Sequence, residues 1–259
     1  MRAPVKYTIT AVLAVAFAVG IAALARQSRG QRAQATCSGL DVSFRDSLNF
    51  VTEEDIKSCL DREYGAYVGQ VLDSVRLYEI EEMLESRSAV KDCEAWTTGD
   101  GMLHIAITQR KPAVRFKKGD VGFYADSRGY IFPLHKSYTA AVPLVEGDLP
   151  LSVGPNHRGE ADTPEEREWI SSVLNLLGAV ESRSFRHKVR SMKVRPGGDF
   201  VLQLDTLKEQ FVIGYPDHLA EKFARVDKYI GWIRPAKGGT YYKTVNVKYN
   251  KQIICRKDI

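Results

Sequence analysis

The 259-residue sequence lacks the short motifs that usually mark a catalytic or metal site. It contains no His-Glu-x-x-His, Gly-x-Ser-x-Gly or Gly-x-x-x-x-Gly-Lys pattern, and its five histidines are scattered. None of the four cysteines has another cysteine at the Cys-x-x-Cys spacing. These absences argue against a zinc site, a thioredoxin-type site and the common hydrolase and nucleotide-binding classes, so we expect no metal, no cofactor and no small-molecule substrate.

The sequence also lacks a strong block of one charge. The formal net charge of +5 is spread along the chain, and the longest basic block, residues 115–118, is interrupted by a phenylalanine. Nucleic-acid binding usually needs a basic patch or stripe, so it has little support here. The mild basicity is instead consistent with a surface near anionic lipid or cell-wall polymer.

The four cysteines, Cys37, Cys59, Cys93 and Cys255, are widely spaced. Cys59 falls on the apolar stripe of a predicted helix, and Cys255 falls on the inner face of a predicted strand. We therefore expect core positions for them. A disulfide between Cys59 and Cys93 stays open as an alternative in an oxidising compartment, because the sequence does not give their distance.

One long uncharged run is present near the amino terminus. Residues 7–25, from Tyr7 to Ala25, form a run of 19 residues without a charged side chain. A helix of that length reaches roughly 28 Å, close to the roughly 30 Å hydrocarbon layer of a bilayer. We predict a single transmembrane helix here, preceded by a cytoplasmic stub (residues 1–6) and followed by a linker (residues 26–36).

The alternative to an anchor is a cleaved secretory signal, because Ala33-Gln34-Ala35 has the small-x-small spacing of a cleavage site. The apolar run is longer than a usual signal, and a polar, arginine-rich stretch separates it from that motif. The basic residues on its two sides do not settle the orientation. The short leading tail favours a cytoplasmic amino terminus, with the bulk of the protein outside the inner membrane.

Residues 37–109 have the pattern of a small α+β domain. Thr52, followed by three acidic residues, is a typical helix start. Apolar residues three and four apart predict a second helix, and Thr98-Gly99-Asp100-Gly101 predicts a hairpin turn. The expected βααββ order has a strand over residues 39–44, helices that begin near residues 53 and 77, and strands over residues 90–97 and 103–108.

Residues 110–259 predict a larger mixed β-domain with an antiparallel-rich sheet and two or more helices. Thr163 and Pro164 mark the start of a helix, and Gly178 suits its end. Turn residues separate the apolar runs around it. The predicted strands cover residues 113–116, 121–125, 130–134, 189–194, 200–204 and 210–213, and a further helix carries Leu219, Phe223, Val226, Ile230 and Ile233.

The carboxyl-terminal end predicts a hairpin, with strands over residues 243–249 and 252–256 and a turn at Asn250-Lys251. We see nothing after Arg256 that would cover the outer edge of this hairpin. An edge strand presents unpaired N–H and C=O groups that a partner strand can bind. We therefore predict that this edge is where the protein binds others.

A family resemblance begins at Gln109-Arg110-Lys111-Pro112. This segment closes the βααββ module and resembles the junction between the POTRA domain and the β-domain of the bacterial cell-division family FtsQ, also called DivIB. Other matches are residues 123–134, residues 142–147 and residues 245–249, which look like the penultimate strand of the family with its basic-Tyr ending. Arg110 and Pro112 are the predicted interdomain joint. Proline fixes φ and lacks an amide donor, so it ends the strand and limits the angle between the domains.

The resemblance implies a non-catalytic scaffold of the divisome, located at the division septum. Its carboxyl-terminal region would receive a β-strand from FtsB, itself paired with FtsL, outside the inner membrane. Lys248 and Tyr249 match the partner-binding positions of the family. Asn250, Gln252 and Ile253 are adjacent and carried over with them.

Two other functions stay open. A membrane-anchored or secreted cell-wall-modifying enzyme would use Asp126 and Glu146, because glycoside hydrolysis needs two carboxylates. Asp126, however, falls in a turn, where aspartate is common for local hydrogen bonding. The other alternative is a POTRA-type factor for outer-membrane assembly or secretion. The sequence has no long array of membrane-type alternating strands, which counts against it.

Overall fold

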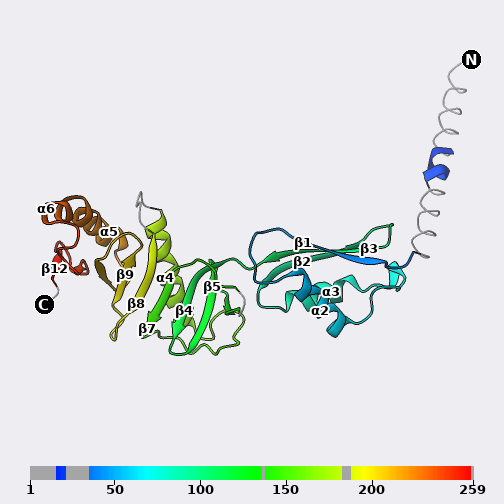
Figure 1. Cartoon of the computed structure of the whole chain (residues 1–259), viewed down its shortest axis with the longest axis horizontal. Helices are drawn as coiled ribbons and strands as arrows, with labels where there is room; N and C mark the ends of the chain where they lie inside the picture. Colours follow the sequence, from blue (N-terminus) through cyan, green and yellow to red (C-terminus); the bar gives the residue numbers. More distant parts are fainter. Residues whose placement is uncertain (1–15, 22–34, 136–137, 183–187, 258–259) are drawn as a thin grey trace, which may run out of the picture. The chain divides into compact units, whose positions relative to one another are not determined.

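The computed structural model describes residues 16–21, 35–135, 138–182 and 188–257 (Figure 1). The chain divides into two compact units, Met1–Gln109 and Arg110–Ile259. Each unit has its own hydrophobic core.

Most of the predicted anchor lies outside the described residues. Of residues 7–25 the structure describes only 16–21, which are helical. The predicted stub over residues 1–6 and most of the linker, with Ala33 and Gln34 of the cleavage motif, also fall outside. Among the residues that are described, no helix has both the length and the apolar character that a bilayer crossing requires.

The first unit is a three-stranded sheet with helices, in the βααββ order that the sequence predicts. β3 is central, with β1 parallel to it on one side and β2 antiparallel on the other. Thr52 begins the first helix through a capping box with Asp55. A π-helical turn over Leu60–Tyr64 extends this helix. The elements are β1 (Gly39–Phe44), α2 (Glu53–Cys59), α3 (Leu77–Glu85), β2 (Val90–Thr97) and β3 (Met102–Gln109).

Three cysteines lie in the core of the first unit, as predicted for Cys59. Cys37, Cys59 and Cys93 are buried among residues such as Ile80 and Ile105, and all four cysteines of the chain are free thiols. The Cys59–Cys93 disulfide that the sequence left open is therefore absent. Burial and nearby carboxylates raise the pKa of Cys93 to about 12.

The second unit is built on a nine-stranded mixed sheet, counted over the described residues, in the order β12-β11-β10-β9-β8-β7-β4-β5-β6. Five of its eight strand pairs are antiparallel and three are parallel, so the predicted antiparallel-rich sheet is confirmed. The strands are β4 (Pro112–Lys118), β5 (Val121–Asp126), β6 (Ile131–Pro133), β7 (Leu144–Gly147), β8 (Val189–Val194), β9 (Phe200–Leu204), β10 (Gln210–Gly214), β11 (Thr244–Asn246) and β12 (Ile254–Arg256).

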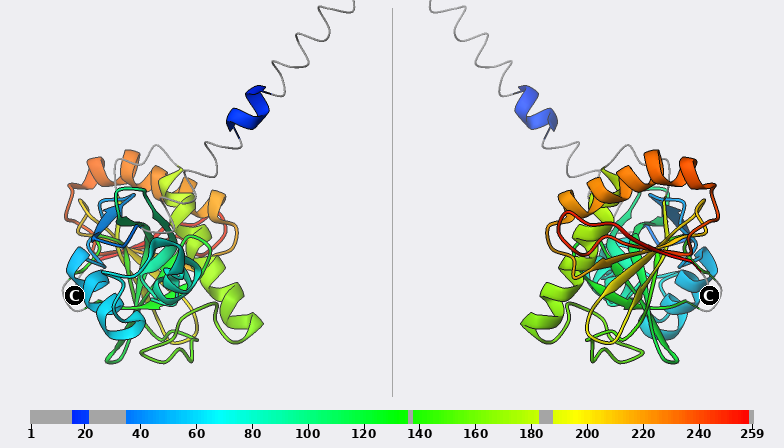
Figure 2. Two further views of the ribbon diagram at one scale, coloured as in Figure 1. Left: turned by 90° about the vertical axis from the view of Figure 1, so that its right-hand side faces the viewer. Right: turned by 90° about the vertical axis from the view of Figure 1, so that its left-hand side faces the viewer.

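Two helices pack their apolar sides into the core of this sheet. α4 (Pro164–Glu181) begins at the Thr163 cap, as predicted, but the predicted end at Gly178 is wrong. Val180 lies beyond that glycine and is 3% exposed, so its burial favours one more helical turn. α5 (Leu219–Lys228) continues through a π-helical turn (Tyr229–Ile233) into α6 (Arg234–Lys237). In both views of Figure 2 this orange helical run lies next to the red carboxyl-terminal segment.

Candidate functional site

β12 is an edge of the large sheet. It pairs with β11 on one side, and no other described strand lies on its outer side. Ile254 and Arg256 are exposed, whereas Cys255 is half-buried and packs against the core. The predicted inward position of Cys255 is therefore confirmed, and the strand offers backbone donors and acceptors to solvent.

The hairpin is shorter than the sequence predicts. Strands were expected over residues 243–249 and 252–256, but β11 ends at Asn246 and β12 begins at Ile254. The side chain of Asn246 accepts a hydrogen bond from the backbone N–H of Lys248 at 3.0 Å, which turns the chain out of the strand. The five predicted partner-binding residues therefore lie in the connection between the strands: Lys248, Tyr249, Asn250, Gln252 and Ile253.

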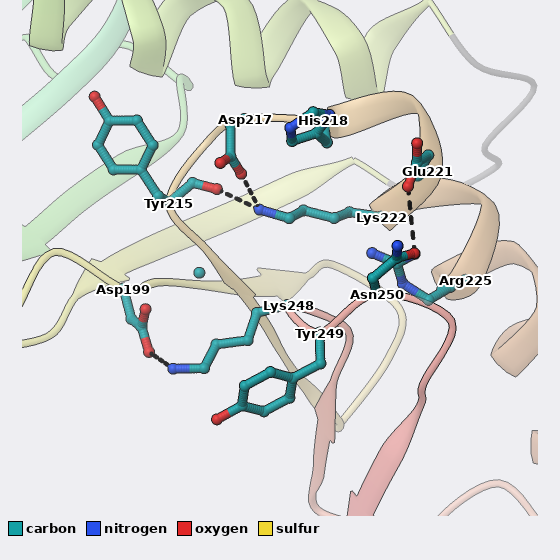
Figure 3. Close-up of a pocket in the computed structure, with 11 residues that line it drawn as sticks. Asp199, Tyr215, Asp217, His218, Glu221, Lys222, Arg225, Lys248, Tyr249 and Asn250 are labelled. Carbon is teal, nitrogen blue, oxygen red and sulfur yellow. Dashed lines mark hydrogen bonds and ion pairs between the residues drawn. The ribbon is translucent and has the colours of Figure 1, made fainter.

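The first part of this connection forms one wall of an open groove of about 440 Å³ (Figure 3). The opposite wall is the connection from β10 to α5, with the first turns of α5. Gly214 permits the close approach of the two, because a Cβ at Gly214 would lie 2.8 Å from the Cβ of Lys248. The side chains that line the groove are Asp199, Tyr215, Asp217, His218, Glu221, Lys222, Arg225, Lys248, Tyr249 and Asn250.

Ion pairs organise the groove. Lys248 donates to Asp199 at 2.7 Å, and its ammonium lies 5.2 Å from the ring centre of Tyr249. The Asp199 carboxylate raises the pKa of Lys248. On the opposite wall the buried Lys222 donates to the Tyr215 carbonyl at 2.7 Å and to Asp217. The hydrogen bond from Lys222 lowers the pKa of Asp217.

Arg225 ties α5 to the end of β11. Its Nε donates to the Val247 carbonyl at 3.0 Å, and its Nη1 lies 3.9 Å from the Glu221 carboxylate. The helix therefore holds the backbone just ahead of Lys248 and Tyr249. This contact fixes the wall that carries the predicted partner-binding residues.

Two strained backbone positions flank the groove. His218 (φ 44°) and Lys251 (φ 59°) are the non-glycine residues with positive φ in the described part of the chain. Such positions cost of order 1–3 kcal/mol each and often cluster at functional sites. His218 lines the groove, and Lys251 follows Asn250 in the opposite wall. The strain is therefore concentrated in the two loops beside the open edge.

The sequence did not single out Asp199, Asp217, Lys222 or Arg225 as site residues. The sequence placed Asp199 only in a turn after Gly197-Gly198. In the structure this turn leads into β9, which pairs with β10, and Asp199 lies within hydrogen-bond distance of Lys248. No signal in the sequence joins it to Lys248 across 49 positions. Only the strand order of the sheet brings them together.

Arg110 and Asp126 are placed together at the other end of the unit. Arg110 Nη1 donates to Asp126 Oδ2 at 3.0 Å, and its guanidinium stacks 3.6 Å from the centre of the Tyr130 ring. Asp126 also accepts from the backbone N–H groups of Arg128 and Tyr130, which is the turn role that its position predicts. Pro112 is buried and begins β4, opposite Asp126.

Asp126 and Glu146 do not form a carboxylate pair. Asp126 lies opposite Pro112 and Glu146 lies opposite Lys117, on the two sides of β4. Five residues along a strand cover about 17 Å. Glycoside hydrolases hold their two carboxyl groups roughly 5 to 10 Å apart, so these residues do not have that geometry.

Comparison with protein families gives two matches, one in each unit. Residues 35–108 match a POTRA-like domain. Residues 111–256, more than half of the chain, match the family described as FtsQ/DivIB, C-terminal related. A comparison with curated proteins gives no match. The chain therefore belongs to the FtsQ/DivIB family of cell-division proteins.

Proposed function

We propose that this protein is a non-catalytic scaffold of the divisome that binds a partner division protein by β-strand addition at the outer edge of β12. The observation that carries the proposal is that β12 pairs on one side only, within the described residues, and that the connection leading into β12 lines a groove of about 440 Å³. A partner strand gains a ladder of main-chain hydrogen bonds, and the groove can accept a side chain that follows it.

The family suggests an FtsB-type strand, with an FtsL-type protein bound to FtsB. Tyr249 is 48% exposed beside the groove, and aromatic residues of this kind often supply much of the binding energy of an interface. Lys248, Asn250, Gln252 and Ile253 lie around it and would contact the same partner segment. Since the Lys248–Asp199 pair is partly exposed, a partner carboxylate can compete for Lys248.

The test is binding of the full-length protein to an FtsB-type partner after Tyr249→Glu. Burying a carboxylate at this interface is unfavourable, so we expect a loss of affinity of about 30-fold or more, as for a hot spot of about 2 kcal/mol. The matched control is Tyr78→Glu, a 73% exposed tyrosine on α3 of the first unit, which should bind as before. Unchanged affinity of Tyr249→Glu would reject this site.

We also propose that residues 7–25 anchor the protein in the inner membrane, with a cytoplasmic amino terminus and both domains in the periplasm at the septum. The 19-residue uncharged run supports this, because its helical length suits a bilayer. Protease added to spheroplasts should digest the domains and leave an amino-terminal tag intact. A soluble protein that has lost residues 1–35 would indicate a cleaved signal instead.

A further inference from the structure

A buried carboxylate lies at the base of the carboxyl-terminal hairpin, away from the groove. Glu209 immediately precedes β10, and its side chain is 0% exposed. Its Oε1 accepts from Arg234 Nε at 2.8 Å and from the Tyr229 hydroxyl at 3.2 Å. Its Oε2 has no donor among the described residues. Because an unpaired buried charge is very unfavourable, this carboxylate depends on its two donors.

Arg234 connects Glu209 to the segment that leads into β11. Its Nη2 donates to the Gly239 carbonyl at 3.1 Å. Gly239 leaves room for the guanidinium, since a Cβ there would lie 2.7 Å from Nη2. A guanidinium holds its donors in a fixed plane, so these two bonds set the position of residues 234–239 relative to the start of β10.

Aromatic contacts continue from this ion pair to the end of β12. The Tyr229 ring lies 6.5 Å from the Tyr242 ring, which lies 4.8 Å from the Tyr241 ring. Lys257, the first residue after β12, places its ammonium 3.9 Å from the centre of the Tyr241 ring. Burial and the Glu209 carboxylate raise the pKa of Tyr229, so its hydroxyl stays protonated and can donate.

The backbone joins the same elements. The N–H of Gln210 donates to the Lys243 carbonyl at 2.8 Å, and the N–H of Lys243 donates to the Arg256 carbonyl at 2.9 Å. The residue after Glu209 is thus bonded to the root of the hairpin. The side-chain contacts and the backbone contacts therefore converge on the end of the sheet that carries β11 and β12.

We infer that Glu209 and Arg234, with Tyr229, form a lock that positions the β11–β12 hairpin, and that they are positioning residues for partner binding. The inference rests on the proposed function, because the proposed function makes the hairpin the site of partner binding. A pair that only stabilised the fold would affect the whole second unit alike. A lock on the hairpin affects residues 244–257 and leaves the remaining strands as they are.

Hydrogen exchange of the full-length protein without partner tests the lock. In Arg234→Gln we expect the amides of residues 244–257 to exchange at least tenfold faster, with those of residues 189–204 unchanged. Arg110→Gln is the matched control, because it removes the arginine from another arginine–carboxylate pair whose carboxylate is buried in this unit, and it should leave residues 244–257 unchanged. Equal acceleration of both segments in Arg234→Gln, or none in residues 244–257, would overturn the inference.

Two further variants keep the test decisive. Arg234→Lys keeps the positive charge but loses the planar donors, so its exchange should fall between those of the parent and Arg234→Gln. If Arg234→Gln does not fold, Tyr229→Phe decides, because it removes one of the two donors to Glu209 and keeps the aromatic ring. Faster exchange of residues 244–257 with residues 189–204 unchanged supports the lock in that variant, and unchanged exchange of residues 244–257 rejects it.

Partner affinity separates this inference from the proposed function. If hairpin exchange rises as expected and the parent protein does not bind its partner at β12, the proposed function fails and the lock remains. If the parent binds at β12 and Arg234→Gln binds equally well despite faster exchange, the proposed function remains and the positioning role fails.

Discussion

The two edge strands of the large sheet, β6 and β12, differ in whether another segment is hydrogen-bonded to their outer side. At the β6 edge, Ile131 and Gly159 exchange both backbone hydrogen bonds, at 2.7 Å and 3.1 Å, so a loop of the protein covers this strand. At the β12 edge no described segment does the same. Exposed edges invite unwanted pairing, and proteins usually cover or interrupt them. One edge of the sheet is therefore covered and the other is open within the described residues, as the proposed binding site at β12 requires.

The ion pairs near the two edges differ in how far their side chains are exposed to solvent. Arg110 and Asp126, near the covered edge, have side chains that are 10% and 8% exposed. Lys248 and Asp199, near the open edge, are each 30% exposed. A buried pair is costly to break, whereas a partly exposed pair is easily exchanged. The buried pair therefore fixes the covered end, and the exposure of the Lys248–Asp199 pair suits the proposed competition by a partner carboxylate.

The largest effect should come from Asp126→Ala. It leaves the Arg110 guanidinium buried without its carboxylate and removes an acceptor from two backbone N–H groups. We expect a loss of about 3–5 kcal/mol in the free energy of unfolding, measured by denaturant titration. A loss below 1 kcal/mol would show that the ion pair near the covered edge stabilises the fold no more than the ion pair near the open edge.

A smaller effect should follow from uncovering the β6 edge. Gly159 has a φ of 125°, which suits glycine alone, so Gly159→Val should cost of order 1–3 kcal/mol and speed exchange of the Ile131 amide. Gly154→Val in the same loop is the control, because Gly154 has neither a positive φ nor a close neighbour. Equal effects of the two substitutions would show that the cover does not depend on this backbone conformation.

The reactivity of the Cys255 thiol at the open edge can be compared with that of the Cys93 thiol in the core of the first unit. Cys255 is half-buried in β12, whereas Cys93 is 4% exposed with its pKa raised to about 12. Iodoacetamide at pH 8 should therefore modify Cys255 first, and bound partner should slow that reaction. Modification of Cys93 before Cys255 in the folded protein would contradict the assigned burial.

The raised pKa of Cys93 also sets a pH dependence. The neutral thiol is favoured in the folded state, so its contribution to stability is complete below the ordinary thiol pKa of 9.0. That contribution is lost as the pH rises from there toward about 12. Cys93→Ala should remove this part of the alkaline loss of stability in the first unit, as followed by circular dichroism.

The smallest effect is expected for Asp199→Ala at the open edge. The pair with Lys248 is partly exposed, so we expect a change in unfolding free energy too small to resolve beside that of Asp126→Ala. Since Lys248 then loses its internal partner, affinity for an acidic partner segment should rise or stay level. A large loss of stability would show that the open edge is as rigidly fixed as the covered one.

Local turn chemistry made much of the fold predictable. β8 and β9 have the predicted bounds, because Pro196-Gly197-Gly198-Asp199 separates two apolar runs unambiguously. The start of α4 was equally clear from Thr163 and Pro164. Its end was not, because the burial of Val180 outweighs the helix-ending preference of Gly178.

The candidate site was only partly predictable. Lys248 and Tyr249 were identified from the family resemblance, and the hairpin pattern placed them in a strand. The hydrogen bond from the Lys248 N–H to the Asn246 side chain ends that strand early, and this competition between side chain and ladder is hard to read from sequence. Asp199 and Lys222 reach the groove only through the strand order, which no local pattern encodes.

The most direct test is amide hydrogen exchange of the full-length protein with and without an FtsB-type partner segment. If that segment adds a strand to the sheet, amides of residues 254–256 should become protected on binding, while those of residues 131–133 at the covered edge stay unchanged. Protection confined to any other part of the chain, with residues 254–256 exchanging as fast as before, would contradict an open β12 edge as the binding site.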